Sequence, residues 1–390
     1  MRLLNTIGLL LSLLVACTPS HKNTEIVETK AIHLDLTQDF DDAPLQLDKY
    51  LDEFKLIQLE TNPDNLLSYF RGYIGDKNII AFSQEKIMWF SADGKYKRAI
   101  AIKGKGPDEF KQIDAWAVDD EEQYFLYHDR ERDYIYKFDL ATGTFVDEIP
   151  FEDKGYLSSM LIVNDTTLAF MPSQFATYGY LYFYQNTDGK VFNGVEKTDK
   201  PHPGAWAGTD QYFKQLNDYS ILLQKSDTDT IYQVQGGEMQ PYIYLGLEEQ
   251  KISGYKTTGY AASPIYIKNE KFFFNKYSFE KEISPNNASM SINNNHYLIF
   301  DKKDQSIESF GKAYFNYYGL KIPISYFSFT NDGHLINFIQ AYKLKTLIDE
   351  TLKEGELSEA QKSFLVDLNS KIKDDDNPIL ITGKINLQNI

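Results

Sequence analysis

The residues most suggestive of chemistry form one short segment, Lys103–Phe110, with the sequence KGKGPDEF. Two glycines around a lysine could hold a phosphate, because glycine lets backbone N–H groups approach the anion and lysine adds positive charge. A phosphate loop also needs the pattern Gly-x-x-x-x-Gly-Lys-Ser/Thr, or a third glycine, followed by a helix. Here position 109 is Glu, and a strand-like stretch follows. We therefore expect a structural linker and no cofactor, with Gly104 and Gly106 permitting tight backbone angles and Pro107 stiffening the exit.

The histidines and carboxylates form no recognisable catalytic or metal-binding motif. The histidines stand at positions 21, 33, 128, 202, 296 and 334 without His-Glu-x-x-His spacing, and the chain has no Gly-x-Ser-x-Gly element. Carboxylate pairs such as Asp227 and Asp229 are typical of turns. We therefore expect no catalytic residue and no bound metal.

The N-terminus predicts export and lipidation. The sequence MRLLNTIGLLLSLLVAC has a positive start, an apolar run and small residues before a cysteine, which is typical of a secretory signal. Leu14–Cys17 looks like a bacterial lipobox, and Cys17 is the one cysteine of the chain. The alternative is a signal peptide that contains a cysteine by chance. We expect residues 1–16 to be the signal peptide and residues 17–30 a lipidated tether. The protein would then be anchored in the cell envelope, at the outer membrane, with its periplasmic or surface side left open.

Composition predicts a large β-rich core and argues against nucleic acid as a partner. Hydrophobic residues make up 42% of the chain and aromatic residues 15%, and flat aromatic side chains pack well on strands. The net charge is -16. Nucleic-acid affinity depends on basic groups that displace phosphate counterions, so this charge makes such binding unfavourable.

A repeated hairpin pattern indicates a β-propeller. Each repeat has an apolar or aromatic strand, a short turn and a second strand, at residues 87–100, 135–149, 181–195, 231–245 and 297–310. The equivalent aromatic residues Phe90, Phe138, Tyr184 and Tyr232 are 48, 46 and 48 residues apart. With four strands in each repeat, this period predicts blades at 69–101, 112–149, 157–195, 211–245 and 262–309. A sixth blade begins at 323–339 and resumes at 377–387.

The stretch FSADGKYKRAIAIKGKGPDEFKQIDAWAVDDEEQYFLYHDRERDYIYKFDL resembles the six-bladed β-propeller lipoproteins of Bacteroidetes, distant relatives of the NHL-repeat propellers. The resemblance extends to FKLIQLETNPDNLL (54–67) and DDDNPILITGKI (374–385). It implies an all-β fold in which residues 31–390 form a single six-bladed propeller of four-stranded blades.

Two features predict how the last blade is built. Apolar spacing at 337–355 and a capping-box pattern at Ser358 and Gln361 predict two helices, inserted at about 340–372. They would cover part of the channel mouth or pack against the last blade. No sequence remains for its fourth strand, so residues 53–60 should pair with 378–385 and join the two ends of the chain.

The loops that cross between blades and those joining the second and third strands should share one face. This face would collect 103–110, 128–133, 152–156, 201–212, 252–260 and 312–319. Its candidate ligand-binding residues are Trp206, Tyr212, Tyr255, Tyr260, Tyr314, Tyr317, His128 and Arg130. We expect a non-catalytic binding or scaffold protein for a glycan, peptide or envelope protein. The alternatives are that these aromatic side chains pack between blades, and that the protein is an exported hydrolase or lyase acting at the channel mouth.

Overall fold

The computed structural model describes residues 31–386 of the chain, all of them within the unit Ala31–Ile390. It leaves out residues 37–42, 107–108, 120, 152–155, 174–179, 197–211, 218–219, 225–228, 236, 248–250, 254–255, 269–270, 285–286, 325–326 and 355. The predicted signal peptide, Cys17 and the tether therefore lie outside the described residues.

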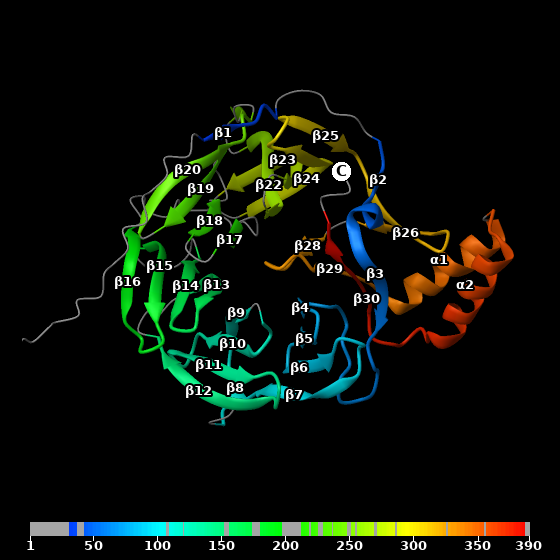
Figure 1. The fold of residues 1–390 in the computed structure, drawn as a ribbon, viewed down its shortest axis with the longest axis horizontal. Coiled ribbons are helices and arrows are strands. Elements are labelled where there is room, and N and C mark those ends of the chain that lie inside the picture. The colour runs from blue at the N-terminus through cyan, green and yellow to red at the C-terminus, as the bar shows by residue number, and fades with distance from the viewer. Residues whose placement is uncertain are drawn as a thin grey trace, which may run out of the picture. The chain divides into compact units, whose positions relative to one another are not determined.

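The described strands form antiparallel sheets of four strands that succeed one another along the chain, some with a short strand added at an edge (Figure 1). The first sheet contains β4 (Gly72–Ile74), β5 (Asn78–Phe82), β6 (Lys86–Ser91) and β7 (Tyr96–Lys103), with β8 (Glu109–Phe110) parallel to β7. The second contains β9 (Ile113–Val118), β10 (Tyr124–Asp129), β11 (Tyr134–Asp139) and β12 (Thr144–Pro150). The third contains β13 (Leu157–Asn164), β14 (Thr167–Pro172), β15 (Tyr180–Asn186) and β16 (Val191–Glu196).

The remaining sheets include strands from the start of the described chain. The fourth contains β17 (Tyr212–Asn217), β18 (Ser220–Gln224), β19 (Thr230–Gln235) and β20 (Glu238–Tyr244), with β1 (Ile32–His33) beside β20. The fifth contains β21 (Lys251–Ser253), β22 (Lys256–Lys268), β23 (Lys271–Ser284), β24 (Asn287–Asp301) and β25 (Ser306–Phe310). A small sheet contains β2 (Leu45–Gln46), β26 (Ala313–Tyr317) and β27 (Leu320–Ile324). The last contains β28 (Ser328–Phe329), β29 (Leu335–Ile339), β30 (Ile379–Ile385) and β3 (Leu51–Gln58), with the 3-10 turn η1 (Leu47–Tyr50) before β3.

The predicted hairpins are confirmed: they correspond to β6–β7, β11–β12, β15–β16, β19–β20 and β24–β25. Burial explains their composition. Every residue of β5 is buried, whereas most of β12 is exposed, so apolar residues fill the inner strands and polar residues the outer ones. Neighbouring sheets share their cores, because one hydrophobic cluster unites Ile80 and Trp89 of the first sheet with Phe125 and Tyr136 of the second. The fold is all-β and propeller-like.

The first strands of the sheets lie next to one another. β9 contacts β13, β13 contacts β17, β17 contacts β22 and β22 contacts β28, while β29 contacts β4. No sheet of the described residues closes on itself. The N-terminal strand β3 pairs antiparallel with β30, with Leu56 opposite Ile381, as the sequence predicts. Asn377, just before β30, ties this strand to the segment after β3 through hydrogen bonds with Leu67 N, Glu60 O and Asn65 O.

The two predicted helices, α1 (Ala341–Glu354) and α2 (Glu359–Lys371), lie between β29 and β30. Ser358 caps α2, and its side chain and that of Gln361 form the predicted capping box. Leu344 and Ile348 of α1 pack into the hydrophobic cluster that also holds Phe315 of β26. This cluster also holds Ile339 and Ile379 of the last sheet, so the helices pack beside both the β26–β27 hairpin and the last sheet. Among the described residues, no helix is long and apolar enough to cross a membrane.

Two of the expected surface loops are strands instead. Residues 312–319 form most of the β26–β27 hairpin, and β26 gains β2 as a parallel neighbour. Residues 252–260 belong largely to β21 and β22. In both segments aromatic and β-branched residues favour strand pairing over an open loop. The sequence pattern alone did not reveal that β26 pairs with β2, a strand far away in the sequence.

Candidate functional site

The first strands of the sheets surround a cavity of about 420 Å³. Such a volume falls in the range of small-molecule sites. Its wall combines hydroxyl, amide, aromatic and charged side chains, and the residues with polar or aromatic groups are Arg71, Tyr73, Asp114, Trp116, Asp119, Ser158, Ser159, Phe213, Lys214, Ser263, Asn275, Tyr297, Phe327, Ser328, Phe329, Thr330, Asn331 and Asp332. A ligand there would meet side chains from several sheets at once.

Lys214 on β17 is the most unusual residue of this wall. Its ammonium group donates a hydrogen bond of 3.2 Å to the carbonyl of Phe329 on β28, in the last sheet. Burial lowers the pKa of Lys214 to about 8, and the negative charge of Asp332 opposes this effect only in part. A lysine held this way is costly to the fold, and strongly shifted pKa values tend to mark functional sites.

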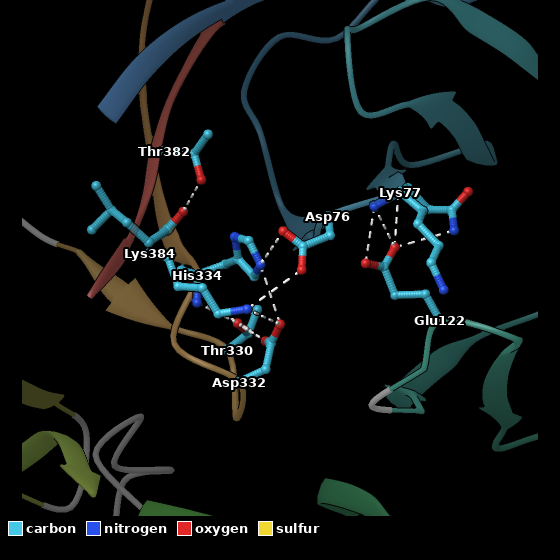
Figure 2. A network of polar contacts seen from close by, with 10 residues as sticks. Asp76, Lys77, Glu122, Thr330, Asp332, His334, Thr382 and Lys384 are labelled. Carbon is cyan, nitrogen blue, oxygen red and sulfur yellow. Dashed lines mark hydrogen bonds and ion pairs between the residues drawn. The ribbon is translucent and has the colours of Figure 1, made fainter. Parts of the chain in front are cut away.

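Next to the cavity, Asp332 belongs to a polar cluster with Asp76, His334 and Lys384 (Figure 2). Nε2 of His334 lies 3.2 Å from Oδ1 of Asp76 and 3.2 Å from Oδ2 of Asp332. The ammonium group of Lys384 lies 3.4 Å from Oδ2 of Asp76 and 4.0 Å from Oδ2 of Asp332. His334 is buried, whereas Asp76 is exposed, so the cluster has one solvent-facing side.

The charges of the cluster shift the pKa values of its members in opposite directions. Burial alone would raise the pKa of Asp332, but its contacts with His334 and Thr330 and the charge of Lys384 outweigh burial, so this pKa is lowered. Burial alone would lower the pKa of His334, but its contact with Asp332 and the charge of Asp76 raise it. The site therefore favours a positive charge between two carboxylates.

Two turns hold these side chains in place. In the β28–β29 turn the hydroxyl of Thr330 donates to Oδ1 of Asp332, and the backbone N–H of His334 donates to that hydroxyl at 2.8 Å. Gly333 has a φ of 93°, a left-handed conformation that glycine adopts without strain. This turn therefore places Asp332 and His334 side by side.

The β4–β5 turn, which carries Asp76, is fixed from the neighbouring sheet by the buried carboxylate of Glu122. This carboxylate accepts hydrogen bonds from the backbone N–H groups of Lys77 and Asn78 and from the Asn78 amide, the closest at 2.7 Å (Figure 2). Glu122 itself has a φ of 54°, which is uncommon for a residue with a side chain. Asp76 is thus held rigidly although it is exposed.

The cluster lies at the opposite strand ends from the predicted binding face. Asp76, Asp332 and His334 come from turns between first and second strands, and Lys384 lies near the end of the third strand β30. The binding face was instead expected where second strands lead to third strands. Because antiparallel strands reverse direction, these two kinds of connection lie at opposite ends of a sheet.

The structure places the predicted site residues in several different locations. Trp206, Tyr255 and Pro107 lie outside the described residues, and Tyr212 and Tyr260 belong to β17 and β22, where their side chains are not described. Tyr314 and Tyr317 lie on β26 and do not line the cavity. The Tyr314 hydroxyl is 3.3 Å from the Gln46 side chain, and Tyr317 packs edge-on against Phe54 and Phe364.

His128 was expected on an exposed loop, but it lies within β10 and is buried. Its Nδ1 is 2.7 Å from Oδ1 of Asp114, whose other oxygen accepts a hydrogen bond from Leu157 N in the next sheet. The pair therefore links two sheets. Arg130 stacks on the ring of Tyr156, at 3.9 Å from the ring centre, and does not line the cavity.

The glycine-lysine segment connects the first and second sheets. The N–H of Gly106 donates a 2.7 Å hydrogen bond to the Glu109 carboxylate, and the N–H of Gly104 donates to Phe110 O at 2.9 Å. A Cβ on Gly104 would lie 1.8 Å from an oxygen of Glu109. The chain's own carboxylate thus occupies the position that a phosphate would need.

The cavity and cluster residues were not identified from the sequence. Lys214, Asp76 and Asp332 read as ordinary strand and turn residues, and His334 was noted only as an isolated histidine. One feature of the sequence could have identified Lys214 as a site residue. The first strand of each propeller repeat faces the centre, so a lysine within such a strand indicates a charge in the central cavity. No local pattern joins Asp76 to His334, since they come from opposite ends of the chain.

Residues 31–384 match the family described as Domain of unknown function (DUF4934). The chain belongs to this family. No curated protein matches the sequence.

Several solved structures resemble this one. A Bacteroides fragilis protein described as an exported protein has a TM-score of 0.60 and 15% sequence identity to this chain. The match covers 91% of this chain and 99% of the Bacteroides fragilis chain. A DUF4221 family member from Bacteroides vulgatus has a TM-score of 0.42 and 11% identity, over 86% and 98%. The Myceliophteria thermophila Cps50 (Swd1) β-propeller domain has a TM-score of 0.38 and 8% identity, over 73% and 95%. At 15% identity, the first of these indicates a common fold.

Proposed function

We propose that this chain is an exported, lipid-anchored β-propeller of the cell envelope that binds an acidic sugar in its central cavity without transforming it. In this account the four-stranded sheets are six blades of a single propeller, as in the lipoproteins of Bacteroidetes that the sequence resembles. The pairing of β3 with β30 supports a ring that is closed at this point. Export and anchoring follow from the signal sequence and Cys17, with the outer membrane as the destination.

The observation that carries the proposal is Lys214. A lysine with a pKa of about 8 inside the cavity lowers the stability of the fold, because the charge of Asp332 compensates for its burial only in part. A carboxylate on the ligand would pair with it and recover part of that cost. The hydroxyl and amide side chains of the wall suit the hydroxyl groups of a sugar, and the aromatic rings of Trp116 and Phe213 suit its apolar face.

The size of the cavity favours a sugar over the peptide and protein partners that the sequence also suggested. At about 420 Å³ the cavity admits a small ligand, whereas a protein surface could not enter it. The predicted aromatic residues Tyr314 and Tyr317 lie in the β26–β27 hairpin, away from this cavity.

Calorimetric titration with a panel of neutral and uronic-acid oligosaccharides tests the proposal. We expect saturable binding of an acidic member by the wild type and a loss of at least tenfold in Lys214→Met. Lys303→Met, at an exposed lysine, is the matched control and should bind normally. Equal affinity of wild type and Lys214→Met for every ligand would rule out this site.

A second function, that of an exported hydrolase or lyase, is favoured by the cluster of Asp76, Asp332 and His334 beside the cavity. A histidine between two carboxylates can move protons or hold a metal ion. Product formation from a bound sugar that is lost in His334→Gln would favour this enzyme, whereas recovery of the intact sugar would favour the binding protein.

A further inference from the structure

We propose that Asp76, Asp332 and His334 bind a divalent first-row transition metal ion, zinc being the best match. Neither the sequence motifs nor the family assigns a metal to this chain. The proposal does not require a sugar in the cavity, although Asp332 belongs both to the cluster and to the cavity wall.

The distances fit a metal ion. Zinc binds imidazole nitrogen and carboxylate oxygen at about 2.0–2.1 Å, so neighbouring ligand atoms of a tetrahedral site lie roughly 3.3 Å apart. Nε2 of His334 is 3.2 Å from the nearest oxygen of Asp76 and 3.2 Å from that of Asp332. One ligand atom from each of the three residues lies within 4.8 Å of the others. An ion placed among them could bind all three with small adjustments.

A second observation concerns His334 alone. Its side chain is 8% exposed, and Nε2 is buried without a hydrogen-bond partner among the described residues. Its nearest polar neighbours are the carboxylate oxygens of Asp76 and Asp332, each at 3.2 Å as an ion-pair contact. A buried polar atom without a hydrogen bond is unfavourable for the fold. A metal ion between Nε2 and the carboxylates would give this nitrogen a partner.

The surroundings prepare the three ligands. Thr330 holds Oδ1 of Asp332 and leaves Oδ2 turned toward His334, while Glu122 fixes the turn that carries Asp76. Partners of this kind orient metal ligands in known sites. The ligand set also indicates the type of ion, because imidazole suits zinc and its neighbours, whereas magnesium and calcium prefer oxygen atoms alone.

Lys384 neutralises the carboxylates when no metal is bound. Its ammonium group is 3.4 Å from Oδ2 of Asp76, and its side chain is 45% exposed. It can therefore turn toward solvent when a divalent ion takes over the charge balance. Lys384 is thus a competitor for the site, and its removal should strengthen metal binding.

The test uses the purified protein without an affinity tag, treated with a chelator and then titrated with zinc chloride by calorimetry. We expect one zinc ion per chain, and a cobalt(II) titration should give the intense visible absorption of a tetrahedral N/O site. His334→Gln and Asp76→Asn should each lower zinc affinity at least tenfold. His33→Gln, at an exposed histidine outside the cluster, is the matched control and should leave zinc affinity unchanged. Lys384→Met should raise zinc affinity.

Asp76 is exposed, so Asp76→Asn tests the proposal even if His334→Gln fails to fold. Absence of a stoichiometric zinc site in the wild type would overturn the proposal. Equal zinc affinity in the wild type and Asp76→Asn would do so too. If Lys384→Met lowers the melting temperature but does not change zinc affinity, the cluster is an ion-pair network and the metal assignment is wrong.

Discussion

Replacing Lys214 by methionine should stabilise the protein. The pKa of Lys214 is lowered from 10.5 to about 8, mainly by burial. Each pKa unit corresponds to about 1.4 kcal/mol, so holding this charge in the cavity costs on the order of 3 kcal/mol at pH 7. Methionine fills a similar volume without the charge but loses the hydrogen bond to Phe329 O, which leaves a net gain of roughly 1–3 kcal/mol.

The sign of the pH dependence is a sharper test than the gain itself. The unfolded chain keeps the lysine proton up to pH 10.5, whereas the folded chain releases it near pH 8. The wild type therefore becomes more stable as pH rises through this window, because its unfolded state binds more protons. The advantage of Lys214→Met should be complete below pH 8 and should shrink by about 1.4 kcal/mol per pH unit between pH 8 and pH 10.

Urea denaturation of both proteins at a series of pH values measures this difference. Other titrating groups affect the two proteins alike and cancel in the comparison. The control Lys303→Met should match the wild type throughout. A constant difference across the series, or a loss of stability in Lys214→Met at pH 7, would refute the account of Lys214 as a charge held in the cavity at the expense of stability.

Four further predictions concern the fold and the anchor. Burial raises the pKa of Tyr184 to about 12 and also raises the pKa values of Tyr127, Tyr182 and Tyr266. The stability that these tyrosines contribute should therefore be complete below pH 10 and decline toward pH 12, as measured by denaturation and by tyrosinate absorbance. Stability that stays constant over that range would contradict this prediction. Gly104→Val should push the Glu109 carboxylate away from the Gly106 N–H and lower the free energy of unfolding by roughly 1.5–3 kcal/mol, as measured by urea denaturation. An unchanged denaturation midpoint would show that the linker does not depend on this hydrogen bond. Asn377→Ala should lower the free energy of unfolding by roughly 2–4 kcal/mol, because it leaves the buried hydrogen-bond partners of Asn377 between β3 and β30 unsatisfied. A negligible loss of stability would count against the proposed closure of the ring at this point. Cys17→Ser should move the protein from the membrane fraction to the soluble fraction on cell fractionation, and continued sedimentation with membranes would disprove lipid anchoring.

Much of the architecture could be predicted from the sequence because it is repeated or local. The hairpins were visible as paired apolar strands with glycine or asparagine turns, and the helices as spaced apolar residues with a cap at Ser358. The pairing of β3 with β30 followed from counting strands, since the last repeat had one too few.

The candidate site could not be predicted in the same way. His334 meets Asp76 only because the first and the last sheets lie side by side, and neither residue has a neighbour in sequence that marks it. His128 shows the opposite error: a histidine near charged residues suggested an exposed site, but its ring is buried and contacts Asp114 of the neighbouring strand β9. Aromatic residues such as Tyr317 misled for a similar reason, because edge-on packing against Phe54 buries part of the ring within the fold.

The most direct test of the central claim is a crystal structure of the protein with the tightest-binding acidic oligosaccharide. The account predicts the sugar in the cavity between the first strands, with its carboxylate within hydrogen-bond distance of the Lys214 ammonium group. An oligosaccharide bound at the β26–β27 hairpin or elsewhere on the surface, with the cavity free of sugar and Lys214 still bonded to Phe329 O, would contradict it.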